Sequence, residues 1–349
     1  MARKTTASRP LPPTASDLSK DTVERSRPGL MVETNGGSSI EKVPGFNNLR
    51  PMTAGFATKI VSGPTILAST PDGGFFSILP GALEPAITVP APVPGTPTYG
   101  AAGKPEDVIG IDDRVMVKDT AVSPWRQICH LEITYDSGQV GFGTGWFAGP
   151  KTVITAAHCL YVRGREPHKA ERVRIIPGRN GTLAPYGYII AKDIRPNDKW
   201  KSAATDQEAA PFDYGAIIIE DAGKTDVDHA PFGERIGYFG MRCYSDEEEQ
   251  QLDMAIVNNA GYPHEAGKPY GSLWFNAGRV HMHNGVAADK HFLEYMADTT
   301  PGQSGSPVFL LDTKTNQRFV VAIHTTGNFV NRGVRLTAEV YDTILEWLK

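Results

Sequence analysis

Residues 127–155 carry the pattern that decides the fold, and they read QICHLEITYDSGQVGFGTGWFAGPKTVIT. Two runs rich in apolar residues, Gln127–Tyr135 and Val140–Phe147, are separated by Asp-Ser-Gly, and a third run, Thr152–Thr155, follows a Gly-Pro turn. β-Branched and aromatic residues favour strands, whereas Gly, Pro, Asp and Ser favour turns. The stretch therefore predicts three successive strands.

The same texture continues on both sides of this stretch, from about Val108 to the end of the chain. Turn residues recur too often to leave room for helical crossovers, which excludes a parallel α/β sheet and favours an all-β sandwich or a pair of barrels. The further strands predicted are Val173–Ile176, Tyr188–Ala191, Tyr214–Ile219, Met254–Val257, Trp274–Val280, Phe292–Met296, Pro307–Leu311 and Phe319–His324.

One helix is predicted, at the very end of the chain. Thr337 can cap its first turn, where Glu339 suits the helix dipole, and Val340, Ile344 and Leu348 recur at a spacing of four residues. These signals together indicate an amphipathic C-terminal helix.

Composition excludes several classes of protein. The chain has 349 residues, of which 40% are apolar, and it carries a net charge of −4, which leaves no basic excess for nucleic acid. No apolar run reaches the ~18 residues that span a membrane. Three cysteines allow at most one internal disulfide, which excludes a disulfide-built scaffold.

Residues 1–107 differ from the rest, and we expect a weakly structured leader there, followed by one domain over residues 108–349. The leader holds 15 of the 27 prolines and none of the five tryptophans. Prolines at this density interrupt packed elements, so only short strands are expected, around Thr58–Val61 and Phe75–Leu79. The first residues lack the 7–15-residue apolar stretch of a secretory signal.

Three segments carry the residues of a nucleophilic mechanism. They are ITAAHC, which ends at His158 and Cys159; FDYGAI, which contains Asp213; and GQSGSP, which contains Ser304. A serine hydroxyl needs a base to take its proton, imidazole titrates near neutrality, and a carboxylate fixes the imidazole tautomer. Gly302 allows the backbone to turn so that the amides of Gly302 and Ser304 converge as an oxyanion hole.

The order His158, Asp213, Ser304 gives gaps of 55 and 91 residues in an all-β chain. The nucleophile elbow of α/β-hydrolases requires Gly-x-Ser-x-Gly and a histidine that comes last, and position 306 is serine here. That fold is therefore rejected.

At these segments the sequence resembles the chymotrypsin-like (trypsin-like) serine peptidases, and among them the glutamyl endopeptidase branch. The resemblance implies two six-stranded antiparallel β-barrels with a C-terminal α-helix, with His158 as general base, Asp213 as its orienting partner and Ser304 as nucleophile. It spans residues 108–349 and rests also on VIGIDDR from Val108, TGW from Thr144, PGRNGT from Pro177, GYFG from Gly237, GYP from Gly261 and NRG from Asn331.

The resemblance further implies cleavage after glutamate, less often aspartate, with Thr299 and His324 lining the specificity pocket. Donors are needed because a carboxylate loses hydration when it enters a closed pocket. Asp298 taken alone predicts the opposite specificity, since an anion there would select Lys or Arg at the cleavage site. Asp298 either governs such a basic-selective pocket, or turns away from the pocket or hydrogen-bonds the backbone.

The leader boundary is expected between Asp107 and Val108. Glu106 and Asp107 would suit an acidic-specific peptidase, acting on itself or supplied in trans, and the resemblance places the new amino terminus at Val108 near the pocket. Gln303 replaces the aspartate that pairs with the new amino group in many relatives, and a neutral amide cannot form that ion pair.

Several further expectations complete the sequence-based picture. No cofactor and no metal are expected, since His281 and His283 lack an evident third ligand. Relatives often pair the cysteine that follows the catalytic histidine with one at the place of Gly143, so Cys159 lacks that disulfide partner.

The expected binding partners are protein or peptide substrates with acidic residues, not nucleic acid or membrane, and the chain is expected to be a monomer. Secretion is expected, with the cytoplasm as alternative, and an inactive peptide-binding homologue is the rival function.

Overall fold

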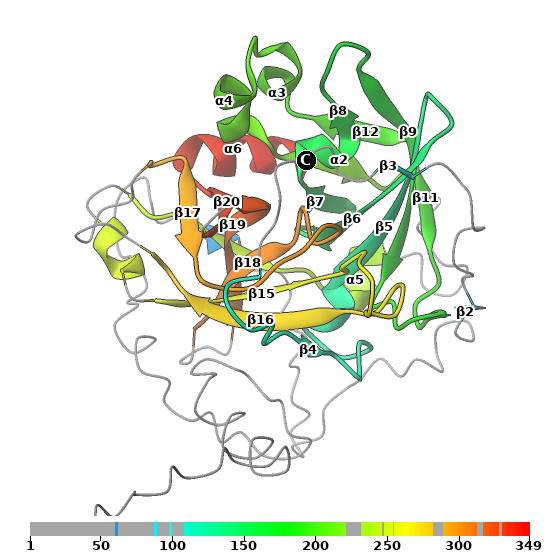
Figure 1. Cartoon of the computed structure of the whole chain (residues 1–349), viewed down its shortest axis with the longest axis horizontal. Coiled ribbons are helices and arrows are strands. Elements are labelled where there is room, and N and C mark those ends of the chain that lie inside the picture. The colour runs from blue at the N-terminus through cyan, green and yellow to red at the C-terminus, as the bar shows by residue number, and fades with distance from the viewer. Residues whose placement is uncertain are drawn as a thin grey trace, which may run out of the picture.

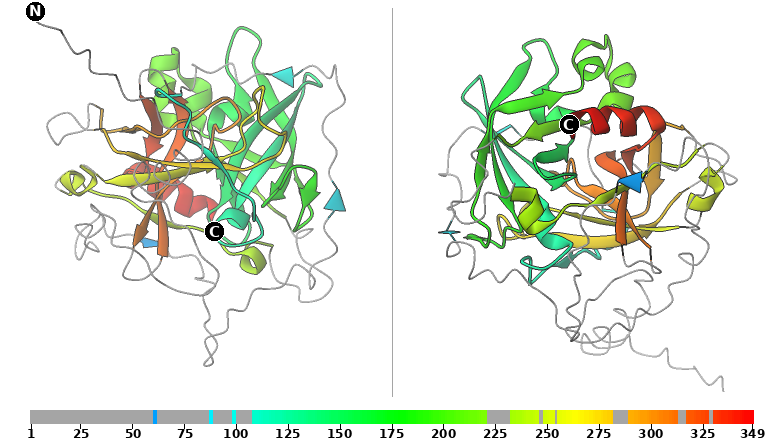
Figure 2. Two further views of the ribbon diagram at one scale, coloured as in Figure 1. Left: turned by 60° about the horizontal axis from the view of Figure 1, so that its bottom comes forward. Right: turned by 180° about the vertical axis from the view of Figure 1, so that it is seen from behind.

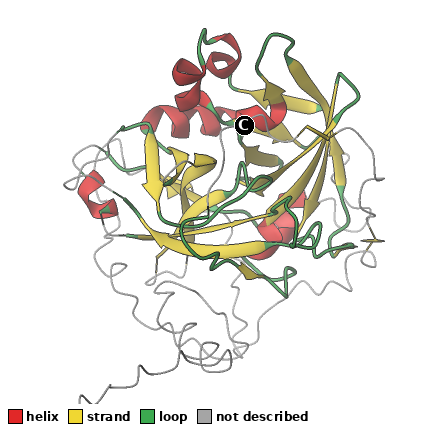
Figure 3. Ribbon diagram, in the orientation of Figure 1, coloured by secondary structure: helices red, strands yellow, loops and turns green. Residues whose placement is uncertain are grey.

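A computed structural model describes residues 108–220, 232–245, 248–253, 255–281, 289–312, 317–327 and 330–349, and three short strands farther upstream. The described chain is mostly β-structure with few helices (Figure 3). Its strands form two large sheets, each curved like a barrel, which lie side by side in Figure 1 as a cyan-to-green sheet and a yellow-to-orange sheet.

The first sheet is built around strands β5 and β6, joined by the predicted Asp-Ser-Gly turn. Ile128 pairs with Trp146 and Thr134 with Val140, so the hairpin is antiparallel throughout. The order across the sheet is β11-β9-β5-β6-β7-β13-β12. Their bounds are β5 Ile128–Tyr135, β6 Val140–Phe147, β7 Thr152–Thr155, β9 His168–Pro177, β11 Ile189–Ala191, β12 Asp193–Pro196 and β13 Gly215–Ile218, with β8 (Tyr161–Val162) at the edge of β9.

The second sheet follows the order β14-β19-β18-β15-β16-β4, with β20 between β17 and β19. Its pairs are antiparallel apart from β14 with β19. The bounds are β4 Val115–Met116, β14 Gly240–Arg242, β15 Ile256–Gly261, β16 Trp274–Arg279, β17 Phe292–Tyr295, β18 Pro307–Asp312, β19 Gln317–Gly327 and β20 Asn331–Arg335.

Helices are short except for the last. They are α2 (Ala157–Leu160), α3 (Asp198–Ser202), α4 (Asp206–Ala209), α5 (Phe232–Ile236) and α6 (Ala338–Trp347). The Thr337 hydroxyl accepts the Val340 N–H and caps α6, as the sequence predicts. No helix in the described part of the chain is long and apolar enough to cross a bilayer.

One apolar cluster joins the two sheets and α6. Helix α6 is the red helix in the right panel of Figure 2, which shows the molecule from behind. Trp146 comes from the first sheet and Phe309 from the second, and Tyr341 and Ile344 reach the same cluster from α6. Burial of large apolar side chains is worth ~1.5–3 kcal/mol each, so this shared core fixes how the two sheets meet. Ile154 and Tyr214, which come from two of the three segments singled out in the sequence, belong to this cluster.

The predicted all-β class with two barrel-like sheets and a C-terminal helix is confirmed. The described residues give nine strands in each sheet, three more than expected, and two of the nine in each sheet are only two residues long. Two of these short strands lie upstream of residue 108: β1 (Ile60–Val61) pairs with β14, and β3 (Thr98–Tyr99) pairs with β6. A further short strand, β2 (Ile87–Thr88), pairs with β10 (Leu183–Ala184).

Single strands match the sequence prediction unevenly. The strand predicted at Met254–Val257 is β15, which starts two residues later and extends to Gly261, and β12, β14 and β20 were not predicted. The strand expected at Thr58–Val61 corresponds to β1, whereas Phe75–Leu79 lies outside the described residues.

Candidate active site

His158 and Asp213 meet because their strands are neighbours. His158 follows β7 on α2, Asp213 precedes β13, and β7 pairs antiparallel with β13 so that Thr155 lies opposite Gly215. Both oxygens of Asp213 bind the histidine: Oδ1 accepts the His158 backbone N–H at 2.8 Å, and Oδ2 lies 2.7 Å from Nδ1. This two-point contact fixes both the position and the tautomer of the imidazole.

The environment of His158 sets its basicity. Burial by itself lowers the pKa of His158, but the charge and hydrogen bond of Asp213 outweigh burial and raise the pKa well above its ordinary value. Nε2, the other ring nitrogen, is buried and has no hydrogen-bond partner among the described atoms. An imidazole held in this way can accept a proton at Nε2.

Ser304 lies on a tight turn just before β18. The Ser304 carbonyl accepts the Thr144 N–H at 2.9 Å and the Cys159 thiol at 3.8 Å. Since Cys159 directly follows His158, the turn that carries the serine packs against the helix that carries the histidine. The three segments singled out in the sequence therefore converge at one place in the fold.

Gly305 makes this approach possible. Its φ is +87°, and a Cβ there would lie 2.2 Å from both the Thr144 carbonyl oxygen and the Thr155 hydroxyl. The Gly305 N–H donates to the His324 carbonyl at 2.7 Å, and the His324 N–H donates to the Ser306 carbonyl at 2.9 Å. Strand β19 thereby anchors the turn from the second sheet.

Gly302 has a φ of +100°, a conformation that favours glycine, and a Cβ there would lie 2.6 Å from the Tyr262 carbonyl oxygen. The Gly302 carbonyl accepts the Thr144 hydroxyl at 2.8 Å, and the Gln303 N–H donates to the Thr300 carbonyl at 3.1 Å. The loop is thus held on both sides with Gly302 and Ser304 flanking Gln303. The sequence drew attention to Thr144 only within the TGW motif, and its role in binding this loop was not predicted.

The two residues expected in the specificity pocket are fully buried. His324 Nδ1 lies 2.5 Å from the Tyr295 hydroxyl, which fixes the ring orientation. Thr299 Oγ1 is buried and has no hydrogen-bond partner among the described atoms. A buried hydroxyl of this kind is costly unless a ligand or water satisfies it.

Asp298 hydrogen-bonds the backbone, which is one of the arrangements that the sequence left open. Its carboxylate accepts the Ile109 N–H at 2.6 Å and the Asp113 N–H at 3.0 Å. Burial raises the pKa of Asp298, although these two N–H groups act to lower it. Val108 is the residue directly before Ile109, so it adjoins the segment that binds Asp298.

The cysteines Cys129, Cys159 and Cys243 are all buried, and none of them forms a disulfide. Gly143 does face Cys159, since a Cβ on Gly143 would lie 3.0 Å from the Cys159 sulfur. The place is therefore suited to the disulfide that the resemblance describes, and only the second cysteine is missing.

Comparison with known proteins identifies the family of this chain. Residues 143–323 match the family model described as a trypsin-like peptidase domain. The glutamyl endopeptidase of Bacillus licheniformis is 35% identical over 249 residues, which cover 69% of each chain. The chain belongs to the trypsin-like serine peptidases. It is a serine endopeptidase, and within the family it resembles the glutamyl endopeptidases.

Other relatives of this peptidase widen the picture. The protein named extracellular metalloprotease of Bacillus subtilis is 30% identical over 246 residues, 70% of each chain. A solved Glu endopeptidase structure superposes with a TM-score of 0.55 at 23% identity and covers 69% of this chain and 99% of that chain, which supports the fold. Within the described residues, no group of three or more His, Cys, Asp or Glu side chains could hold a metal ion. His281 is described, whereas His283 lies outside the described residues.

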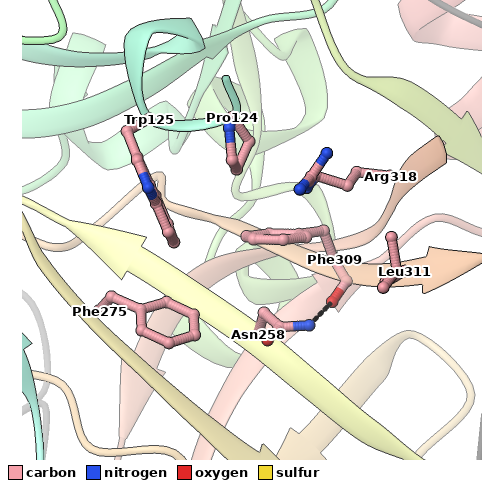
Figure 4. Close-up of a pocket in the computed structure, with 7 residues that line it drawn as sticks. All are labelled: Pro124, Trp125, Asn258, Phe275, Phe309, Leu311 and Arg318. Atoms are coloured by element: carbon pink, nitrogen blue, oxygen red, sulfur yellow. Dashed lines mark hydrogen bonds between the residues drawn. The ribbon is translucent and has the colours of Figure 1, made fainter. Parts of the chain in front are cut away.

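The peptidase also has a small pocket that shares no residue with the predicted site. Figure 4 shows Trp125, Phe275 and Phe309 around it, with the Asn258 amide donating to the Phe309 carbonyl at 3.2 Å. Successive strand residues point to opposite faces, and Asn259 contacts Gln303, so this pocket lies on the other face of β15 from the nucleophile loop.

Proposed function

We propose that this peptidase hydrolyses peptide bonds after glutamate, less often aspartate, with His158, Asp213 and Ser304 as its catalytic triad. The observation that carries the proposal is the two-point contact of Asp213 with His158, next to a serine turn that packs on Cys159. Protein and peptide chains with acidic residues are the substrates.

The mechanism follows from the roles of these groups. Ser304 Oγ attacks the carbonyl carbon while its proton passes to His158 Nε2, and Asp213 stabilises the imidazolium. The amides of Gly302 and Ser304 bind the oxyanion, each donor contributing about 3–4 kcal/mol to lowering the barrier. The imidazolium then protonates the leaving amine, and water repeats the sequence to release the acid.

Acidic preference is supported by the pocket. Thr299 offers a buried hydroxyl with no hydrogen-bond partner in the described part of the chain, and His324 lies on the strand that anchors the Ser304 turn. Asp298 uses both carboxylate oxygens on backbone N–H groups, which argues against its acting as the anion of a basic-selective pocket. The relative from Bacillus licheniformis is named a glutamyl endopeptidase.

We further propose that the chain is made as a precursor with a leader over residues 1–107 and is processed between Asp107 and Val108. The α-amino group freed at Val108 would add positive charge beside Thr299. Secretion fits the name of the Bacillus subtilis relative, which is called extracellular.

A peptide-library digest read by mass spectrometry tests the specificity, with fluorophosphonate labelling as a parallel assay. Cuts after Glu and Asp, and labelling lost in Ser304→Ala, are the expected results. Cuts clustered after Lys or Arg would show that Asp298, and not His324, determines the specificity. A folded wild-type protein that neither labels nor cuts would favour the inactive binding homologue.

A further inference from the structure

Arg114 is a wholly buried arginine whose guanidinium uses all of its N–H groups. Its side chain is 0% exposed. An arginine side chain has five N–H donors, and five contacts are made here. They are Nε to Asp112 Oδ1 at 2.9 Å, Nη2 to Asp112 Oδ2 at 2.9 Å and to Glu265 Oε1 at 2.7 Å, and Nη1 to Thr300 Oγ1 at 2.5 Å and to Gln303 Oε1 at 2.6 Å.

The charge of this arginine is balanced locally. Asp112 and Glu265 supply two carboxylates, and Lys268 Nζ lies 2.6 Å from Asp112 and 3.4 Å from Glu265. The hydrogen bond from Arg114 lowers the pKa of Asp112, even though burial opposes it. Only Arg114 is fully buried in this cluster of two cations and two anions, and a buried arginine that loses its carboxylate partners is strongly destabilising.

Two of these contacts reach the loop that carries the nucleophile. Thr300 and Gln303 lie in the loop between Asp298 and Ser304, and Gln303 is the residue between the two proposed oxyanion amides. The Gln303 side chain also accepts the Thr300 N–H at 3.1 Å and donates to Asn259 Oδ1 at 3.4 Å. Arg114 is therefore the charged group that determines where the Gln303 side chain lies.

Resting on the proposed function, we infer that Arg114 is a positioning residue for the oxyanion hole. Through Gln303 it holds Gly302 and Ser304 so that their amides point at one spot. The segment from Ile109 to Arg114 thus binds the loop at Asp298, Thr300 and Gln303. In many relatives an aspartate paired with the new amino terminus holds this loop. Here the internal Arg114, paired with the neutral amide of Gln303, holds it.

The first test is Arg114→Met, which keeps the apolar stem and removes all five donors. Oxyanion stabilisation acts on the transition state, so we expect kcat and the rate of fluorophosphonate labelling to fall together by about 10²-fold, with KM changing far less. Arg195→Met is the matched control. Arg195 makes the same two-point contact with Asp193, at 2.9 and 2.6 Å, but its side chain is 45% exposed and lies on β12. It should leave kcat unchanged within twofold.

Gln303 gives a second route if Arg114→Met fails to fold. Gln303→Met removes the acceptor and leaves Arg114 paired with Asp112 and Glu265, so kcat should fall. Gln303→Glu restores an acceptor and should regain most of the lost rate, which a purely structural role would not produce. The double variant Arg114→Met/Gln303→Met should lose no more than the worse single variant, because both remove one interaction.

Each outcome separates the inference from the proposed function. A folded Arg114→Met enzyme with wild-type kcat, equal losses in Gln303→Met and Gln303→Glu, or multiplicative losses in the double variant would each overturn the role of Arg114. Wild-type protein that neither labels nor cuts peptides would overturn the proposed function itself.

Discussion

At the scale of single residues, one carboxylate oxygen of Asp213 binds the backbone of His158 and the other binds its ring. The backbone contact, at 2.8 Å, fixes where the helix starts, and the ring contact, at 2.7 Å, fixes the tautomer. A neutral acceptor could not replace the carboxylate, because the charge of Asp213 is what keeps the pKa of His158 raised.

The raised pKa of His158 predicts the acid side of the pH profile. The imidazole must be neutral to accept the serine proton, so activity is lost as pH falls through that pKa. We expect the acid limb of kcat/KM to have its midpoint above the ordinary value of about 6.5. Asp213→Asn should move the midpoint down and lower kcat by about 10⁴-fold, as in related triads. A midpoint that does not move in Asp213→Asn would show that another group controls the limb.

Thr299 predicts the residue-level basis of selectivity. Thr299→Val keeps the shape of the side chain and removes the buried hydroxyl. A hydrogen bond to a charged group is worth about 1.5–3 kcal/mol, so the preference for Glu over Gln substrates should fall by about 10–100-fold. Thr134→Val is the control, since Thr134 is half-buried on β5 and its hydroxyl accepts Arg172 Nε at 3.3 Å, away from Thr299. Paired peptides that differ only in Glu or Gln measure the ratio of their kcat/KM values. An unchanged ratio in Thr299→Val would show that Thr299 does not contact the substrate side chain.

At the scale of elements, the proposed active site is a consequence of strand pairing. Strands β7 and β13 bring His158 and Asp213 together, and β18 and β19 hold the Ser304 turn between their backbones. Gly143 on β6 sits at the contact between these units, opposite Cys159.

This contact predicts that Gly143→Cys forms a disulfide with Cys159. A Cβ at Gly143 would lie 3.0 Å from the existing sulfur, which fits disulfide geometry. The bond would close a loop of about 16 residues and stabilise the fold by about 3 kcal/mol. A rise of several degrees in Tm that a reductant abolishes is the expected result, with Gly143→Cys/Cys159→Ser as control. Two titratable thiols more than expected after denaturation without reductant would contradict it.

At the scale of the whole molecule, the segment after Asp107 joins the second sheet through β4 and also hydrogen-bonds the loop that carries Ser304. Ile109 and Asp113 bind Asp298, Arg114 binds Gln303, and β4 pairs with β16 directly afterwards. Every one of these contacts lies downstream of Val108, so cleavage between Asp107 and Val108 would leave all of them intact.

We therefore predict that the active form starts at Val108. N-terminal sequencing of purified active enzyme should give VIGID, and Glu106→Gln/Asp107→Asn should block or shift the cut, since neither new side chain is acidic. Lys104→Gln, in the same stretch, is the control and should be processed normally. An active form that starts well away from Val108 would contradict the proposed boundary.

The sequence alone predicted most of the elements that surround the site, because short apolar runs bounded by turn residues identify strands directly. It failed where tertiary contacts replace local preference. Strand β15 contains the buried pair Asn258 and Asn259, which is tolerated because their side chains bond the Phe309 carbonyl and Gln303. Strand β20 (NRGVR) has no alternating pattern and is held by its two neighbours, β17 and β19.

By itself, the sequence determined the all-β class, the C-terminal helix, and the residue types and order of a serine peptidase. Only the tertiary structure decided which way Asp298 faces and what Gln303 binds. Their partners lie 185–189 positions away in the sequence, at Ile109, Asp113 and Arg114. Periodicity and motifs record local preferences, whereas the direction of a buried polar side chain is set by whichever distant donors the packed chain brings within hydrogen-bond distance.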